Sequence, residues 1–153
     1  MRDSRCGSTI DRIERAARES DEASEFESGG ATPRQLRHEV LLVDDDVTFV
    51  ETFGALLRLH GYDVIAEFTL PAALRYLSSH TPDVLITDLR LEGGDGWTLA
   101  DYAAVHQPTL PVVVVTGAAY VMETDEHYGR IPVFLKPFDP DALLRYLEGV
   151  FAI

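Results

Sequence analysis

Several polar side chains each stand at the end of a short apolar run of the sequence. They are Asp44, Asp45 and Asp46 after VLLV, Asp88 after VLIT, Thr116 at the end of VVVVT, and Lys136 after VFL. Lys136 is the only lysine of the 153-residue chain. Neighbouring carboxylates repel one another, so a protein that gathers them needs positive charge to offset the repulsion.

These residue types suit the chemistry of phosphate. Mg²⁺ prefers oxygen ligands, and proteins usually hold it with one or two carboxylates, waters and phosphate oxygens. Beside such an ion, Asp88 could attack a phosphoryl group and form an acyl phosphate. Lys136 could stabilise the phosphoryl oxygens by its charge, and Thr116 could donate a hydrogen bond to one of them. The residues therefore predict a magnesium-dependent phosphoryl-transfer site, provided that the fold brings them together.

The segments around these residues predict such a fold. Runs rich in Val, Ile and Leu alternate with segments of helical periodicity, which is typical of parallel βαβ units with helices on both faces of the sheet. We expect strands at 39–43, 62–68, 83–88, 111–117 and 131–137, and helices at 47–60, 71–80, 94–106 and 139–151. The alternation calls for a further helix at 118–128, although that segment is too polar to predict one. In a doubly wound α/β sandwich the site lies at the carboxyl ends of the strands.

Residues 1–38 differ in composition from the rest of the chain. They hold seven arginines against eight acidic residues, and ESGGATP at 27–33 is typical of a linker. Within 9–26, Ile10, Ile13 and Ala17 fall at helical spacing. We expect a mobile or partly helical N-terminal extension and linker over 1–38, with a short docking or dimerisation helix as the alternative. A single domain is expected over 39–153.

Charge and composition disfavour some classes of partner and location. The net charge is −13, whereas nucleic acids and anionic membrane surfaces are bound by clustered Lys and Arg. No run approaches 18 apolar residues, and the N-terminus has no apolar signal region. The lone Cys6 gives no support for an oxidising compartment. We therefore expect a cytoplasmic protein with no direct contact to nucleic acid or membrane.

Four motifs carry the polar residues in order along the chain. They are DDD at 44–46, TDLRLEGGDGW at 87–97, VVVVTG at 112–117 and FLKPF at 134–138. Together, over residues 39–151, they resemble the receiver domain of two-component response regulators. The resemblance implies a flavodoxin-like fold, in which a doubly wound five-stranded parallel sheet has the strand order 2-1-3-4-5 and is covered by five helices. It also implies a cis peptide bond between Lys136 and Pro137.

The same resemblance implies a role for each acidic residue. Asp88 would be the phosphoacceptor, supplied by the phosphohistidine of a sensor histidine kinase or a histidine phosphotransfer protein. Asp45 would bind Mg²⁺ directly and Asp44 mainly through water. Arg90 would offer its backbone carbonyl to the ion.

The resemblance also places a switch. Lys136 would bind the phosphoryl group and Thr116 would be the switch hydroxyl. The switch position three residues before the lysine, often aromatic in the family, is Val133 in this chain. Its neighbour Phe134 should point to the opposite face of the strand. The interval from Thr116 to Lys136 is 20 positions, which is slightly short for the family.

Two other carboxylates are expected to serve the fold. Thr48 and Glu51 form a possible capping box at the start of the following helix, and Asp46 is an alternative N-cap, a role that suits it better than that of a metal ligand. Asp95 is expected in a loop or cap that opens the 94–106 helix.

We therefore expect a single-domain response regulator that is phosphorylated on Asp88 and signals through a downstream protein target or onward phosphotransfer. A homodimer is left open, and no enzymatic activity is expected beyond magnesium-dependent self-phosphorylation and autodephosphorylation. One alternative is a pseudo-receiver, an interaction module that does not depend on phosphorylation. Another is a magnesium-dependent hydrolase, which would want a general acid two residues after Asp88, where this chain has Arg90.

Overall fold

The computed structural model describes residues 37–117 and 129–152. Its elements are β1 (Glu39–Val43), α2 (Val47–Leu59), β2 (Asp63–Glu67), α3 (Leu70–Ser79), β3 (Val84–Thr87), β4 (Arg90–Leu91), β5 (Gly94–Asp95), α4 (Gly96–His106), β6 (Val112–Thr116), β7 (Val133–Leu135) and α5 (Pro140–Phe151). The expectations for the N-terminal extension before Arg37 and for the 118–128 segment fall outside the described residues and stay predictions.

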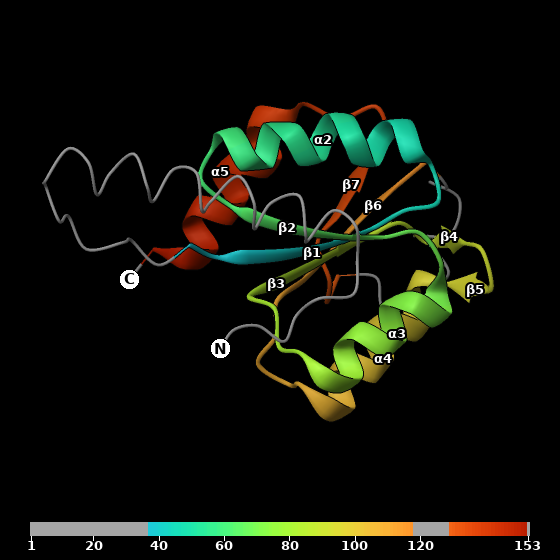
Figure 1. Ribbon diagram of the computed structural model, residues 1–153. Coiled ribbons are helices and arrows are strands. Elements are labelled where there is room, and N and C mark those ends of the chain that lie inside the picture. Colours follow the sequence, from blue (N-terminus) through green and yellow to red (C-terminus); the bar gives the residue numbers. More distant parts are fainter. Residues whose placement is uncertain (1–36, 118–128, 153) are drawn as a thin grey trace, which may run out of the picture.

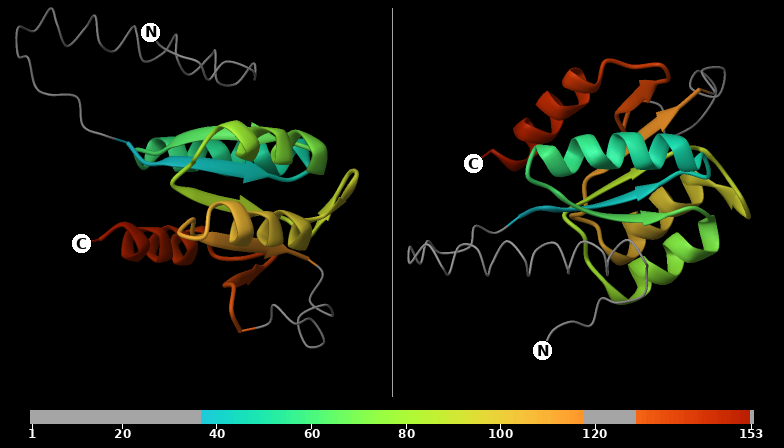
Figure 2. Two further views of the ribbon diagram at one scale, coloured as in Figure 1. Left: turned by 90° about the horizontal axis from the view of Figure 1, so that it is seen from below. Right: turned by 45° about the horizontal axis from the view of Figure 1, so that its top comes forward.

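The main sheet has five parallel strands in the order β2-β1-β3-β6-β7. Because β6 and β7 are its fourth and fifth strands along the chain, this is the predicted order 2-1-3-4-5. The strands β2 and β7 lie at opposite ends of the sheet (Figure 2). The order reverses between β1 and β3, and ligands bind at such a switch point in open α/β sheets.

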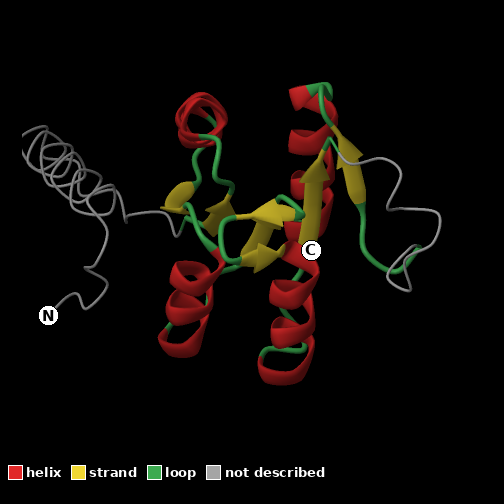
Figure 3. Cartoon of the chain, turned by 90° about the vertical axis from the view of Figure 1, so that its right-hand side faces the viewer, coloured by secondary structure: helices red, strands yellow, loops and turns green. Residues whose placement is uncertain are grey.

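Helices cover both faces of the sheet, as the alternating sequence predicts. The helices α2 and α5 pack on one face, and α3 and α4 pack on the other (Figure 1), so the strands lie between helices (Figure 3). Within β1, Val40 and Leu42 contribute to the core under α2 and α5, whereas Leu41 and Val43 contribute to the opposite core. A strand buried on both faces needs an apolar residue at every position, which explains the unbroken VLLV run.

Helix caps fix where the helices begin. The Asp46 side chain accepts a hydrogen bond from the Phe49 amide at 3.2 Å, and Asp95 accepts one from the Thr98 amide at 3.0 Å. The cap positions at Asp46 and Asp95 are confirmed, whereas the possible capping box from Thr48 and Glu51 is wrong because Asp46 takes the N-cap. Each cap satisfies an amide that has no partner within its helix.

A small hairpin that the sequence analysis did not predict lies between β3 and α4. The strands β4 and β5 pair antiparallel, with Leu91 opposite Gly94, and the chain turns through Gly93 at a φ of 91°. A side chain at Gly93 or Gly94 would collide with Pro71 or Leu70. The hairpin uses residues 94 and 95, so the helix expected from residue 94 begins at Gly96.

One further backbone expectation is met. The Lys136–Pro137 peptide bond is cis, as the resemblance implied. Across residues 37–117 and 129–152, no helix has both the length and the apolar character needed to cross a membrane.

Candidate functional site

The parallel strands deliver their following residues to one edge of the sheet. Val43 at the end of β1 pairs with Thr87 at the end of β3, and the Asp88 amide donates to the Val43 carbonyl at 3.0 Å. The next residues, Asp44 and Asp88, therefore stand side by side. On the neighbouring strands, the Lys136 amide donates to the Thr116 carbonyl at 2.9 Å. The structure thus gathers the predicted residues at the carboxyl edge.

Lys136 connects two of the carboxylates. Its Nζ donates to Asp44 Oδ2 at 2.6 Å and to Asp88 Oδ2 at 3.1 Å, although these residues lie 92 and 48 positions away in sequence. Asp44 is fully buried and Asp88 is only 8% exposed, so the lysine provides charge where solvent provides little. The ring centroid of Phe49 lies 4.4 Å from the same Nζ, a cation–π contact that further fixes the ammonium.

The pKa values of Asp44 and Lys136 are both raised, but for different reasons. Burial raises the pKa of Asp44 because it disfavours the charged carboxylate, and the hydrogen bond from Lys136 opposes this only in part. Burial alone would lower the pKa of Lys136, but its hydrogen bonds and charge interactions with Asp44 and Asp88 outweigh burial and raise that pKa. Lys136 is therefore a permanent cation at neutral pH.

A third carboxylate completes an acidic cluster. Carboxylate oxygens of Asp44, Asp45 and Asp88 all lie within 4.8 Å of one another, and Asp45 is exposed. Three carboxylates against one ammonium leave excess negative charge, and their hard oxygen atoms suit Mg²⁺. The residues present therefore fit a divalent cation. Asp46 is turned away into its cap on α2, as expected.

The Asp88 side chain is held from two sides. Its Oδ1 accepts hydrogen bonds from the Leu89 amide at 2.6 Å and the Arg90 amide at 3.4 Å, while Oδ2 faces Lys136. The Thr87 hydroxyl donates to the Asp88 carbonyl oxygen at 2.8 Å. This side chain is therefore fixed within the acidic cluster by the protein's own groups, which lowers the entropic cost of reaction.

Two residues at the site were not found by sequence reasoning. A side chain at Gly96 would collide with the carbonyl of Asp88, so only glycine lets α4 begin this close to the phosphoacceptor candidate. The glycine pattern GGDGW is the signal that could have indicated a close approach. Phe49, in the first turn of α2, contacts Lys136 as well as the core.

The switch residues lie where expected, without an aromatic side chain at the switch position. Thr116 is buried at the end of β6, next to Lys136. Val133 packs against the cluster of Leu89 and Trp97, whereas Phe134 packs on the α2 and α5 side. The alternation of neighbouring side chains is confirmed.

Arg90 lies in β4, two residues after Asp88, with an exposed side chain. The proposed role of its carbonyl as a metal ligand stays a prediction.

Comparison with known sequences identifies the family. Residues 40–148 match the family model of the response regulator receiver domain. This chain belongs to that family. The receiver domain therefore covers most of the described residues, and the flavodoxin-like fold expected from the motifs is confirmed.

Individual relatives agree with this assignment. The chain is 31% identical over 111 residues to the transcriptional regulatory protein GlrR of Escherichia coli, an alignment that covers 71% of this chain and 25% of GlrR. The chain thus spans about a quarter of that relative's length.

Solved structures show the same fold. A putative response regulator from Chloroflexus aurantiacus is 32% identical with a TM-score of 0.67, covering 75% of this chain and 98% of that structure. The non-phosphorylated HemR receiver domain of Leptospira biflexa is 28% identical with a TM-score of 0.68, covering 76% and 96%.

Proposed function

We propose that this receiver domain is phosphorylated on Asp88 by a phosphohistidine donor in a reaction that requires Mg²⁺. The observation that carries the proposal is the setting of the Asp88 carboxylate. One oxygen is held by backbone amides and the other by Lys136, within 4.8 Å of two further carboxylates. Among the described residues this arrangement has all the groups that an aspartyl phosphate needs around it.

The ligands for Mg²⁺ would be Asp44, Asp45 and Asp88, with the Arg90 carbonyl as a further candidate. When bound, the ion supplies positive charge that offsets the carboxylates and the phosphoryl oxygens. Asp45 is exposed and open to solvent, which suits direct coordination, whereas Asp44 is engaged with Lys136 and suits contact through water.

The residues of the chain carry out the transfer itself. An Asp88 oxygen forms a bond to phosphorus while the phosphorus–nitrogen bond of the donor breaks, and the imidazole leaves with the electron pair. Lys136, kept protonated by its carboxylate neighbours, moves its hydrogen bonds to the incoming phosphoryl oxygens. Thr116, at the same edge, donates a hydrogen bond to another of these oxygens.

The donor would be a sensor histidine kinase or a histidine phosphotransfer protein, and the output would be contact with a downstream protein target or onward phosphotransfer. No catalysis on other substrates is proposed, since Arg90 stands where a hydrolase would want a general acid. The pseudo-receiver remains the second candidate because the switch position carries Val133, whose side chain packs against Trp97 rather than offering an aromatic switch.

Intact-mass measurement after incubation with Mg²⁺ and a small acyl phosphate separates these candidates. The wild type should gain one phosphoryl group, and Asp88→Asn should gain none. The matched control is Asp46→Asn, which removes a nearby negative charge but keeps a good N-cap, and it should still be phosphorylated. A wild type that gains no phosphoryl group with or without Mg²⁺ would establish the pseudo-receiver instead.

A further inference from the structure

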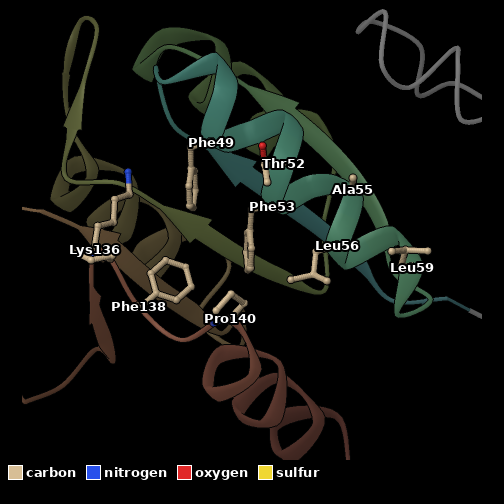
Figure 4. A pocket seen from close by; sticks show the side chains of 10 residues that line it. Phe49, Thr52, Phe53, Ala55, Leu56, Leu59, Lys136, Phe138 and Pro140 are labelled. Atoms are coloured by element: carbon tan, nitrogen blue, oxygen red, sulfur yellow. The ribbon is translucent and has the colours of Figure 1, made fainter.

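An apolar groove of about 690 Å³ runs along α2 on the side that faces the start of α5. Its lining includes Phe49, Phe53, Leu56 and Leu59 from α2 and Phe138 and Pro140 from the opposite side (Figure 4). Leu59 is 82% exposed, so the edge of the groove at this end is apolar and open to solvent. A surface of this shape and composition is suited to the apolar side of a short helix.

The two ends of the groove differ in charge. The end at Phe49 and Lys136, here called the upper end, lies beside the start of α2 and of α5. The exposed residues there are Asp45, Asp46, Asp139 and Asp141. Its lower end, at Leu59, lies beside Arg58 and His60 in the last turn of α2. Lys136 at the upper end is held by Asp44 and Asp88, so the exposed charges there are acidic. The lower end carries both signs, with Arg37 and Arg58 near Asp63.

The chain enters the domain at the lower end. The His38 carbonyl accepts from the Asp63 amide at 3.0 Å, and Arg37 pairs with the Asp63 side chain at 3.5 Å, four residues after Leu59. The His38 ring stacks on Phe151 at the end of α5, with centroids 3.8 Å apart. The preceding 36 residues thus join the domain between the ends of the two helices that flank the groove.

The sequence of that preceding segment matches the groove in pattern and in charge. Ile10, Ile13 and Ala17 give a short apolar stripe at helical spacing. Residues 2–18 hold five arginines and three acidic residues, whereas residues 19–27 hold five acidic residues and no basic residue. With residue 10 at the upper end, the arginine-rich half meets the acidic end of the groove, and the acidic half lies toward Arg58 and Arg37.

We propose that residues 9–26 of this chain bind in the groove as a helix, with Ile10 and Ile13 against Phe49 and Phe138. From Phe49 to Leu59 the groove is about 15 Å long, and the stripe from residue 10 to residue 17 spans about 10 Å. The residues between Ala17 and Arg37 are more than long enough to connect the two ends. Bound in this way, the segment contacts Phe49, whose ring lies against the Lys136 ammonium.

Cys6 makes this proposal testable in the full chain. It is the only cysteine, so a nitroxide can be attached there without other changes. In ¹⁵N-labelled protein, the label should broaden the amide signals of Phe53 and Leu56 in the groove. It should leave Arg75 and Tyr102, on the opposite helices, sharp. This readout does not depend on phosphorylation of Asp88.

Two double variants separate specific binding from general attraction of the segment. Ile10→Asp with Ile13→Asp should abolish the broadening. Ser8→Asp with Ala23→Asp, which adds the same charge away from the stripe, should keep it. Broadening that survives the isoleucine changes, or that is equal on both faces, would overturn the proposal.

Whether the broadening arises within one molecule or between two molecules decides what occupies the groove. Mixing ¹⁵N-labelled Cys6→Ser protein with spin-labelled protein of natural isotope content should leave the groove signals sharp. Broadening in this mixture would assign the groove to a second copy of the chain. Sharp groove signals in the directly labelled protein would leave the groove to another protein. Either result would contradict the proposal.

Discussion

Two junctions between a strand and a helix bring aspartates to the site in different ways. After β1, the chain passes from buried Asp44 through exposed Asp45 to the α2 cap at Asp46 within three residues. After β3, Asp88 is followed by the β4–β5 hairpin, and the α4 cap at Asp95 comes seven residues later. Both junctions end in the same kind of cap, but only the second folds back on its own aspartate.

The difference shows what fixes each carboxylate. At the first junction, Asp44 Oδ1 accepts from the Asp46 amide at 2.9 Å, Oδ2 accepts from Lys136 at 2.6 Å, and the helix follows directly. At the second, the return of the chain presses Gly96 against the Asp88 carbonyl, and the Gly96 amide donates to Leu89 at 2.8 Å. The backbone of the phosphoacceptor candidate is therefore supported by the return of its own chain, whereas the Asp44 side chain is held by the Asp46 amide and Lys136.

Gly96→Ala should have the largest effect on stability, because it acts where the chain returns against the Asp88 carbonyl. The added methyl group has no room beside the Asp88 backbone, so the free energy of unfolding should fall by about 1–3 kcal/mol. Phosphorylation by an acyl phosphate should slow as Asp88 shifts. Urea denaturation measures the stability. Gly149→Ala is the control, since nothing lies near its Cβ, and it should stabilise by about 0.5–1 kcal/mol. If both glycines respond alike, the tight return is not what supports Asp88.

The two caps should contribute equally despite their different junctions. Asp46→Ala and Asp95→Ala each remove one acceptor for a helix amide and should each lower the free energy of unfolding by about 1 kcal/mol. The Asn variants should keep most of the stability, because Asn also caps well. Thermal denaturation of the four variants is the measurement. A loss confined to one Ala variant would mean that the exposed caps are not equivalent.

The first junction should show a dependence on pH that comes from Asp44. Its pKa is raised on folding by burial, so the unfolded state ionises first as the pH rises and stability falls until the folded-state pKa is passed. In metal-free buffer at pH 7, Asp44→Asn should therefore be modestly more stable than wild type. The advantage should disappear below the unfolded pKa of Asp44. Denaturation curves between pH 3 and pH 7 measure it, and a constant difference across this range would contradict the stated cause.

Much of the fold follows from the sequence because it depends on local patterns. Each apolar run, such as VLLV, is a strand, and parallel strands put the residues that follow them at one edge. The caps at Asp46 and Asp95 follow from residue type and position. Asp44, Asp88, Thr116 and Lys136 therefore meet where their places at strand ends predicted.

The rest depends on contacts between distant residues. Nothing near Lys136 indicates that it would divide its hydrogen bonds between Asp44 and Asp88 or contact Phe49, since these contacts depend on side-chain reach across the sheet edge. The β4–β5 hairpin forms where two glycines fit against Leu70 and Pro71 on another helix. Sequence patterns that predict strands extend over about four to eight residues, so they cannot predict strands as short as β4 and β5.

Magnesium binding at the first junction tests most directly the claim that Asp44, Asp45 and Asp88 form a metal site. Asp45 and Asp46 are adjacent and exposed, but Asp45 is assigned to the metal and Asp46 to the helix cap. Mg²⁺ at ten times its dissociation constant should stabilise the wild type by about 1.4 kcal/mol, seen as a rise in Tm. Asp46→Asn should keep that rise, and Asp45→Asn should lose most of it. Equal rises in the two variants would contradict the assignment of Asp44, Asp45 and Asp88 as the metal site.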